Sequence, residues 1–136
     1  MKVKLDTGAV MPLRAHEDDA GYDLYSREDV LIPGNSRHVF DTGVHIQIPH
    51  GFVGMVKSKS GLNVKHGLTC EGVIDSGYTG SIVVKLYNNE FENYHVSKGD
   101  KIGQLVILPI ITPDLELVDS LEETARGDNG FGSTGK

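Results

Sequence analysis

Residues 102–110 read IGQLVILPI, and this run carries the strongest structural signal in the chain. It is rich in aliphatic and β-branched side chains, it is short, and it is punctuated by Pro109. These features are typical of a buried β-strand. The same character appears further upstream: SIVVKLYN at 81–88 is a second β-branched run, and VHIQI at 44–48 alternates apolar and polar residues. Apolar residues therefore recur every two residues, as in a strand, more often than every 3.6 residues, as in a helix.

Glycine and proline interrupt these runs at short intervals. The chain holds 17 glycines and 5 prolines, which favour tight turns between short strands. A short helix is compatible with GLNVKHG at 61–67, and LVDSLEETA at 117–125 is ambiguous. Neither segment sustains three turns of amphipathic spacing. The sequence predicts an all-β protein, a jelly-roll-like sandwich or barrel of short strands.

Length and composition limit the classes of function. At 136 residues the chain fits one domain that buries roughly 65–70% of its unfolded surface. Its net charge of −6 argues against nucleic acid as a partner. The single cysteine, Cys70, excludes an internal disulfide and favours a reducing compartment. With neither a signal peptide nor an apolar run of membrane-spanning length, we expect a cytoplasmic protein without membrane partners.

Common catalytic templates find no match. The six histidines include no pair with zinc-protease spacing, and Ser60 lacks the preceding glycine of a hydrolase nucleophile elbow. Residues 130–136 spell the start of a P-loop, but we do not expect a P-loop here, because that motif needs a strand before it and a helix directly behind its lysine. The RGD triplet at 126–128 is too short to be specific.

Three segments carry groups suited to an anionic ligand. VKSKSGL at 56–62 places two lysines and two serines beside a glycine, RGDNGFGSTGK at 126–136 joins glycines to hydroxyls and an arginine, and GVIDSGYTGSI at 72–82 holds an aspartate three residues before a tyrosine. Each has a plainer interpretation by itself: a solvated lysine pair, a disordered tail, and an Asx-turn with a packed ring.

Taken in order, five segments resemble the motifs of the trimeric dUTP diphosphatase (dUTPase) family. They are AGYDLYS (20–26), KSGL (59–62), GVIDSGYTG (72–80), GDKIGQLV (99–106) and RGDNGFGSTG (126–135). The resemblance implies hydrolysis of dUTP to dUMP and pyrophosphate with Mg²⁺, which supplies dUMP for thymidylate synthesis and removes dUTP. It also implies a jelly-roll homotrimer whose active sites are shared between subunits.

The resemblance assigns roles in catalysis and base recognition. Asp75 would be the general base that activates water for attack on the α-phosphorus, since an ionised aspartate can accept that proton. Tyr78 would lie against the deoxyribose and leave no room for a 2′-hydroxyl. The uracil edge would be read by the backbone of Gly72, Val73 and Ile74.

It likewise assigns the phosphate and metal contacts. Lys59, which stands where the family more usually has arginine, would hold the phosphates together with Ser60 and Gly61. Gln104 would add an uncharged contact to the nucleotide. Asp23 would act through water on Mg²⁺, because this ion keeps several waters and takes other ligands from the triphosphate.

The resemblance divides the chain into a β-domain, residues 1–125, and a mobile glycine-rich tail, residues 126–136. The tail would close over a nucleotide bound at another subunit. Arg126 would clamp the γ-phosphate, Phe131 would stack on uracil, and the terminal phosphates would be wrapped by Gly132, Ser133 and Thr134.

Two alternatives to the diphosphatase stay open on the sequence. One is a dCTP deaminase-like enzyme of the same fold, for which the family pattern would require a glutamate base and a different tail. The other is a non-catalytic β-trimer that senses nucleotide. Whether the gene is cellular or carried by a phage or virus is also left open.

Overall fold

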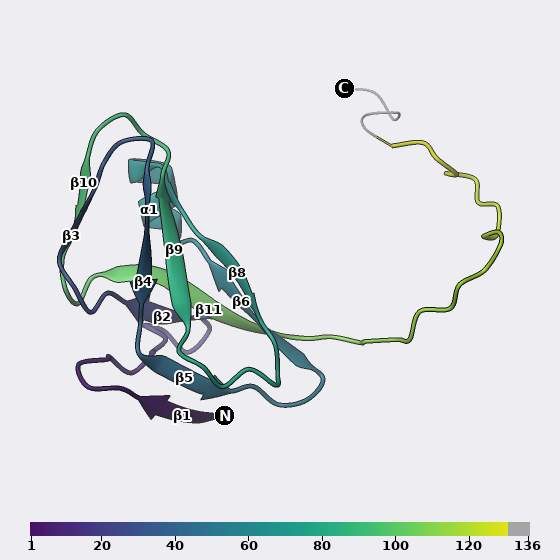
Figure 1. Ribbon diagram of the computed structural model, residues 1–136, viewed down its shortest axis with the longest axis horizontal. Helices are drawn as coiled ribbons and strands as arrows, with labels where there is room; N and C mark the ends of the chain where they lie inside the picture. Colours follow the sequence, from purple (N-terminus) through teal and green to yellow (C-terminus); the bar gives the residue numbers. More distant parts are fainter. Residues whose placement is uncertain (131–136) are drawn as a thin grey trace.

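The computed structural model describes residues 1–130 and confirms the all-β prediction (Figure 1). Its elements, in chain order, are β1 (Lys2–Leu5), β2 (Gly21–Tyr25), β3 (Val30–Ile32), β4 (Arg37–Asp41), β5 (Val44–Gln47), β6 (Phe52–Lys57), α1 (Ser60–His66), β7 (Leu68–Thr69), β8 (Glu71–Ile74), β9 (Val83–Asn88), β10 (Tyr94–Val96) and β11 (Lys101–Pro109). No helix in this part of the chain is long and apolar enough to span a membrane.

The run at 102–110 forms most of β11, the longest described strand, and organises the largest sheet. That sheet has the order β2-β11-β6-β8, so β11 is paired on both edges. A second sheet has the order β4-β9-β7, and two further pairs are β1-β5 and β10-β3. All pairings are antiparallel, which gives the arrangement of short strands that the period-two pattern indicates.

The core lies where the inward faces of these sheets meet. In β9 the buried positions alternate strictly, and Val84, Leu86 and Asn88 point inward. Leu105 of β11 and Phe40 of β4 are fully buried in the same cluster. Burial of each such apolar side chain contributes about 1.5–3 kcal/mol, so the β-domain has a substantial core.

Helix α1 confirms that the segment near 61–67 is helical. It ends at Gly67, whose left-handed φ of 59° lets its N–H reach the carbonyl of Asn63. Only Leu62 packs against the core from this helix. The first residues of α1 stay exposed, which leaves them free to contact a ligand.

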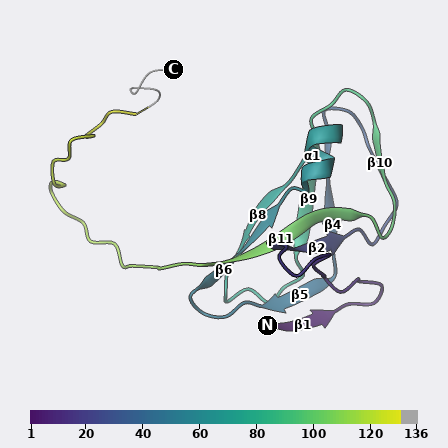
Figure 2. The same cartoon turned by 180° about the vertical axis from the view of Figure 1, so that it is seen from behind.

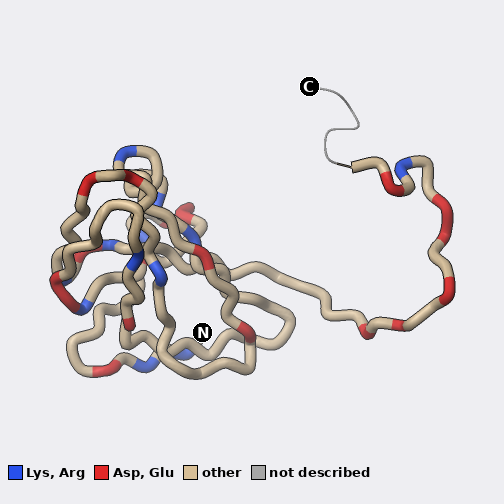
Figure 3. The backbone as a smooth tube through the Cα atoms, turned by 45° about the horizontal axis from the view of Figure 1, so that its top comes forward, with Lys and Arg blue, Asp and Glu red and all other residues tan. Residues whose placement is uncertain are grey.

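The described chain leaves the body after β11. Ile110 N–H donates to the Gly51 carbonyl at 2.8 Å, and residues 111–130 then run outward without a helix or strand (Figures 1 and 2). The segment 117–125, ambiguous in sequence, is therefore irregular within this one chain. Acidic residues are spaced along it (Figure 3). Its large apolar side chains are exposed, namely Ile111, Leu115, Leu117, Val118 and Leu121.

Candidate active site

The carboxylate of Asp23 is the centre of a charged cluster on the β2-β11 edge of the large sheet. The side chain is buried, and it accepts hydrogen bonds from two ammonium groups: Lys59 on Oδ1, and Lys101 on Oδ2 at 2.6 Å. Burial by itself would raise the pKa of Asp23, but the hydrogen bonds and charges of the two lysines outweigh it and hold the pKa below its ordinary value. Asp23 is therefore a fixed, ionised carboxylate.

Gln104 lies beside Asp23 because the β11-β2 register pairs these two residues. Its Nε2 donates to the carbonyl of Ser58 at 3.1 Å. A Cβ at Gly21 would lie 2.4 Å from Gln104 Oε1, so the glycine leaves room for the amide. Ser58 is itself tied to Cys70, donating to its carbonyl and accepting from its N–H. These bonds fix the segment that leads into α1.

The phosphate-binding residues predicted within the β-domain converge here. Lys59 precedes α1, and Ser60 and Gly61 begin that helix with exposed side chains and backbone. The sequence interpretation missed Lys101, although the quoted segment GDKIGQLV contains it. Lys101 could have been found from its position at the start of the predicted strand that carries Gln104. The cluster holds two lysines and one carboxylate, which makes it a cationic surface suited to phosphate.

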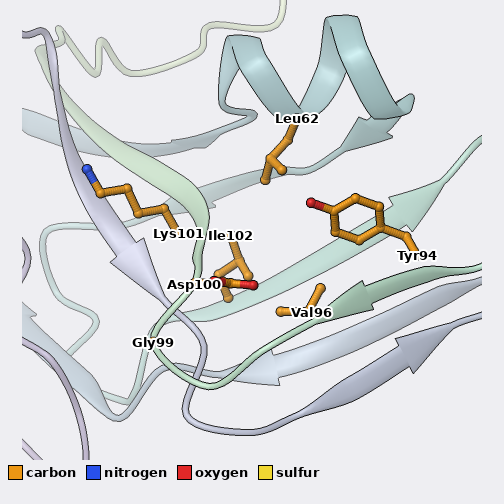
Figure 4. A pocket seen from close by; sticks show the side chains of 7 residues that line it. All are labelled: Leu62, Tyr94, Val96, Gly99, Asp100, Lys101 and Ile102. Atoms are coloured by element: carbon orange, nitrogen blue, oxygen red, sulfur yellow. The ribbon is translucent and has the colours of Figure 1, made fainter.

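A hollow of about 360 Å³ lies next to this cluster, between α1, β10 and the start of β11 (Figure 4). Leu62 and Tyr94 face one another across it. Lys101 extends from its rim in the opposite direction, toward Asp23. The predicted site residues therefore gather outside this hollow and not within it.

The predicted catalytic residues form a second cluster on the turn after β8. Asp75 is exposed, and its carbonyl accepts the N–H of Tyr78 at 3.0 Å. The Tyr78 hydroxyl donates to the Ser81 carbonyl at 2.9 Å while the residue stays 45% exposed. A Cβ at Gly80 would lie 2.4 Å from that hydroxyl. Glycine at 80 therefore lets the ring take this position.

Strand β8 presents the backbone that was predicted to read the base. It pairs with β6 on one side and ends the order of its sheet, so its outer edge has no partner within residues 1–130. The backbone donors and acceptors of Gly72, Val73 and Ile74 belong to this edge strand. An unpaired edge of this kind can form hydrogen bonds with a planar ligand.

The two clusters do not meet within one chain. Ile74, next to Asp75, pairs with Gly54, whereas Asp23 is in register with Gln104 and, beyond it, Lys57. Asp23 and Ile74 are thus offset by three residues along the strands and by three strand spacings across the sheet. This offset corresponds to a distance of about 17 Å between their backbones. Within one chain, the predicted catalytic residues and the Asp23 cluster therefore lie at separate places on the sheet.

The C-terminal residues predicted to complete the site lie elsewhere. Arg126 is exposed on the extended segment, where its Nε donates to the Asn129 carbonyl at 3.1 Å. The other predicted tail contacts, Phe131, Gly132, Ser133 and Thr134, fall outside the described residues.

Among residues 1–130, no group of three histidine, cysteine, aspartate or glutamate side chains could hold a metal by itself. Both oxygens of Asp23 already accept hydrogen bonds from ammonium groups. A single carboxylate of this kind fits Mg²⁺ bound chiefly by water and substrate phosphates, and it does not fit a cation held by the protein alone.

A family model described as dUTPase matches residues 7–135. The chain belongs to the dUTPase family. The curated deoxyuridine 5′-triphosphate nucleotidohydrolase of Paramecium bursaria Chlorella virus 1 is 46% identical over 97% of this chain and 94% of the viral protein. This family membership confirms the resemblance carried by the five motifs.

Two solved dUTPase structures confirm the fold. The Staphylococcus bacteriophage 80alpha dUTPase, solved with dUpNHpp, is 35% identical and matches with a TM-score of 0.93, covering 99% of this chain and 98% of its own. A mutant dUTPase from phage phi11 of S. aureus, described with a structural Mg(II) ion, is 34% identical with a TM-score of 0.83, covering 90% of this chain and 98% of its own.

Proposed function

We propose that this chain hydrolyses dUTP to dUMP and pyrophosphate with Mg²⁺, by attack of water on the α-phosphorus with Asp75 as general base. The observation that carries the proposal is the turn after β8. Within a chain of the dUTPase family, this turn presents an exposed aspartate and an exposed tyrosine beside an unpaired strand edge.

Asp75 has the properties that the proposed base needs. Its carboxylate forms no ion pair with any described residue, and it is open to solvent. It can therefore accept a proton from a water molecule that it orients toward the nucleotide. Asp23, by contrast, is held by two lysines and is unsuited to that task. The two carboxylates thus take different roles, one in proton transfer and one in phosphate and metal organisation.

The base and sugar would be recognised next to the proposed base. The unpaired backbone edge of Gly72, Val73 and Ile74 offers the alternating donors and acceptors that a uracil edge can pair with. Tyr78 follows within the same turn, so its ring can close against the sugar. A packed ring excludes a 2′-hydroxyl by steric contact, which would favour dUTP over UTP.

The phosphates would lie on the second cluster. Lys59 and Lys101 supply positive charge, Ser60 and Gly61 supply exposed donors, and Gln104 contributes an uncharged amide near the same surface. Mg²⁺, when bound, would neutralise charge on the triphosphate, and Asp23 would hold the ion through water. The structural Mg(II) ion described for the phi11 protein supports this cofactor.

We further propose a homotrimer whose active sites are shared between subunits. Two features support it: the base turn and the phosphate cluster are about 17 Å apart in one chain, and the large apolar side chains of 111–121 are exposed in the described part of that chain. An adjacent subunit would bring the two clusters together and cover the apolar segment. The tail, residues 126–136, would then close over a nucleotide on another subunit through Arg126, Phe131, Gly132, Ser133 and Thr134.

The proposal also places the protein in the cytoplasm, since its substrate is an intracellular nucleotide and Cys70 is a free buried thiol. It includes neither nucleic acid nor membrane as a partner. Viral and phage proteins are among the relatives, which fits either a cellular or a phage-borne gene.

One assay tests the activity. Pyrophosphate release is measured from dUTP, UTP, dCTP and dTTP, each with Mg²⁺ and with EDTA. We expect release from dUTP alone, and loss of that release in EDTA. Ammonia release from dCTP would establish the deaminase alternative, and tight dUTP binding without pyrophosphate release would establish the non-catalytic sensor.

The sugar preference gives a second test. Tyr78→Ala is expected to lower kcat/KM for dUTP more than for UTP, because it removes both the contact with deoxyribose and the steric exclusion of a hydroxyl. We expect the dUTP to UTP ratio to fall by about tenfold, in line with a lost contact of about 1–2 kcal/mol. Tyr78→Phe keeps the ring and loses only the bond to Ser81, so it should keep the ratio. An unchanged ratio in Tyr78→Ala would move the discrimination to another residue.

A further inference from the structure

The imidazole of His45, on β5, lies between two oxygen atoms from distant parts of the chain. Nδ1 is 2.9 Å from the carbonyl oxygen of Thr79, and Nε2 is 3.1 Å from Oδ2 of Asp6. The side chain is largely buried, with 19% exposure. One ring thus connects the loop after β1 to the turn that carries Asp75 and Tyr78.

Both neighbours of the ring can only accept hydrogen bonds. A carbonyl oxygen has no proton, and Asp6 is ionised because its hydrogen bond to His45 lowers its pKa. Both ring nitrogens must therefore donate, which only the protonated imidazolium can do. The hydrogen bonds to Asp6 and to the Thr79 carbonyl correspondingly raise the pKa of His45 above its ordinary value.

Other charged groups surround the ring and its Asp6 partner. Lys4 on β1 pairs with Asp6 at 3.7 Å and opposes the charge on the ring. Asp41 at the end of β4 attracts the imidazolium, and it is itself paired with Arg27 at 3.4 Å. The hydrogen bonds to the two direct acceptors affect the pKa of the ring more than the charge of Lys4 does, so the surroundings of His45 favour its protonated form.

The bond to Thr79 is significant because the turn has few other attachments. Residues 75–80 follow β8 and are mostly exposed. Within the described chain, His45 is the only side chain of another element that is hydrogen-bonded to this turn. Thr79 immediately follows Tyr78, so a bond at its carbonyl restrains the proposed sugar-binding ring and, through the turn, Asp75.

Loss of the proton would release this restraint. A neutral ring has one N–H, and the charge-assisted bond to the Asp6 carboxylate is the stronger of the two, so the proton stays on Nε2. The lone pair of Nδ1 then faces the Thr79 carbonyl oxygen, and an attractive contact becomes a repulsive one. Deprotonation therefore selectively weakens the attachment of the turn.

We propose that His45 is a positioning residue whose imidazolium form holds the turn bearing Asp75 and Tyr78 in its binding geometry. The proposal rests on the function proposed above for that turn. Because nucleotide can itself order the turn once bound, the restraint acts mainly on the free enzyme. Its loss should raise KM and change kcat by less than about twofold.

A first experiment follows the restraint without any substrate. The wild-type protein is titrated by NMR from pH 5.5 to 9, with the His45 ring and the Thr79 and Gly80 amides observed separately. We expect both amides to shift with the His45 midpoint, and that midpoint to fall in Asp6→Asn. His38 is the internal control, because its Nε2 contacts Glu28 Oε1 at the same 3.1 Å but has no contact with the turn. Amides that do not follow His45 would overturn the proposal.

The kinetic experiment compares His45→Gln with wild type for dUTP hydrolysis across pH. At pH 6 we expect kcat/KM of the variant to be about 2–10-fold lower than that of wild type, which is the effect of losing one hydrogen bond. The difference should arise from a higher KM. The ratio of the two kcat/KM values should approach 1 at pH values above the His45 midpoint found in the NMR titration, where the wild-type ring has lost its proton. His38→Gln should match wild type at every pH. A ratio that does not change with pH would overturn the proposal.

The pH dependence of Tm provides a further test, because the direction of its change can be predicted. Because the folded-state pKa of His45 is raised, its stabilisation is fully present below the ordinary value of 6.5 and is lost as pH rises through the folded-state value. The difference in Tm between wild type and His45→Gln should therefore shrink with rising pH. If wild type did not hydrolyse dUTP, the proposed function would fail while the NMR titration still tested the restraint.

Discussion

Asp75→Asn is expected to lower kcat for dUTP hydrolysis by about 10²–10⁴-fold while nucleotide binding stays measurable, because general-base catalysis contributes an effect of this size. Asparagine has nearly the same shape as aspartate but cannot take up the proton of the attacking water. Because Asp75 is exposed, the substitution should leave folding intact. The measurements are pyrophosphate release at saturating dUTP and the Kd for the analogue dUpNHpp.

A matched variant controls for loss of a surface carboxylate. Asp29→Asn replaces another exposed aspartate, in the loop between β2 and β3, whose Oδ1 accepts the N–H of Lys98 at 3.0 Å. Asparagine can keep that bond, so we expect kcat to be unchanged. If Asp75→Asn retained a kcat near wild type, Asp75 would not be the base.

Truncation after Ala125 is expected to lower kcat/KM for dUTP by about 100-fold or more. The loss of Arg126 would remove the proposed charge-assisted phosphate contact, of about 1.5–3 kcal/mol. The loss of Phe131 would remove the proposed base stack, of about 1–3 kcal/mol by analogy with stacking on nucleic-acid bases. The full effect on rate requires that these contacts strengthen in the transition state.

The truncated protein should fold and assemble normally. Residues 126–129 are exposed and contribute nothing to the core, so the Tm without nucleotide should stay within about 1–2 °C of the full-length protein. Full activity after truncation would show that the tail has no catalytic role. A large fall in Tm would show that the tail is structural and would contradict the division at residue 125.

Subunit mixing tests whether the tail acts on another subunit. Truncated chains keep Asp75 but lack the tail, and full-length Asp75→Asn chains have the reverse defect. After subunit exchange, a shared site would combine an intact Asp75 with an intact tail and restore part of the activity. Truncation that abolishes activity without any restoration on mixing would keep the role of the tail and reject the shared site.

Local sequence alone determined the strand class and much of the fold. Runs such as 102–110 and 81–88 form strands because β-branched side chains and a spacing of two match the pleated backbone, whatever the strands pair with. The short helix at 60–66 was also indicated locally, since Gly67 supplies the left-handed residue that ends it. Asp75 and Tyr78 share one turn because they are three residues apart.

The tertiary structure decided which distant residues meet. Asp23 joins Lys59 and Lys101 only because β2 pairs with β11, and His45 reaches Thr79 only because β5 lies beside the turn after β8. Neither contact has a local sequence signal, since each depends on strand pairing between segments far apart in the chain. The segment 117–125 stayed ambiguous because its large apolar side chains, Leu117, Val118 and Leu121, are exposed in the described part of the chain. Packing against the β-domain therefore does not specify its conformation.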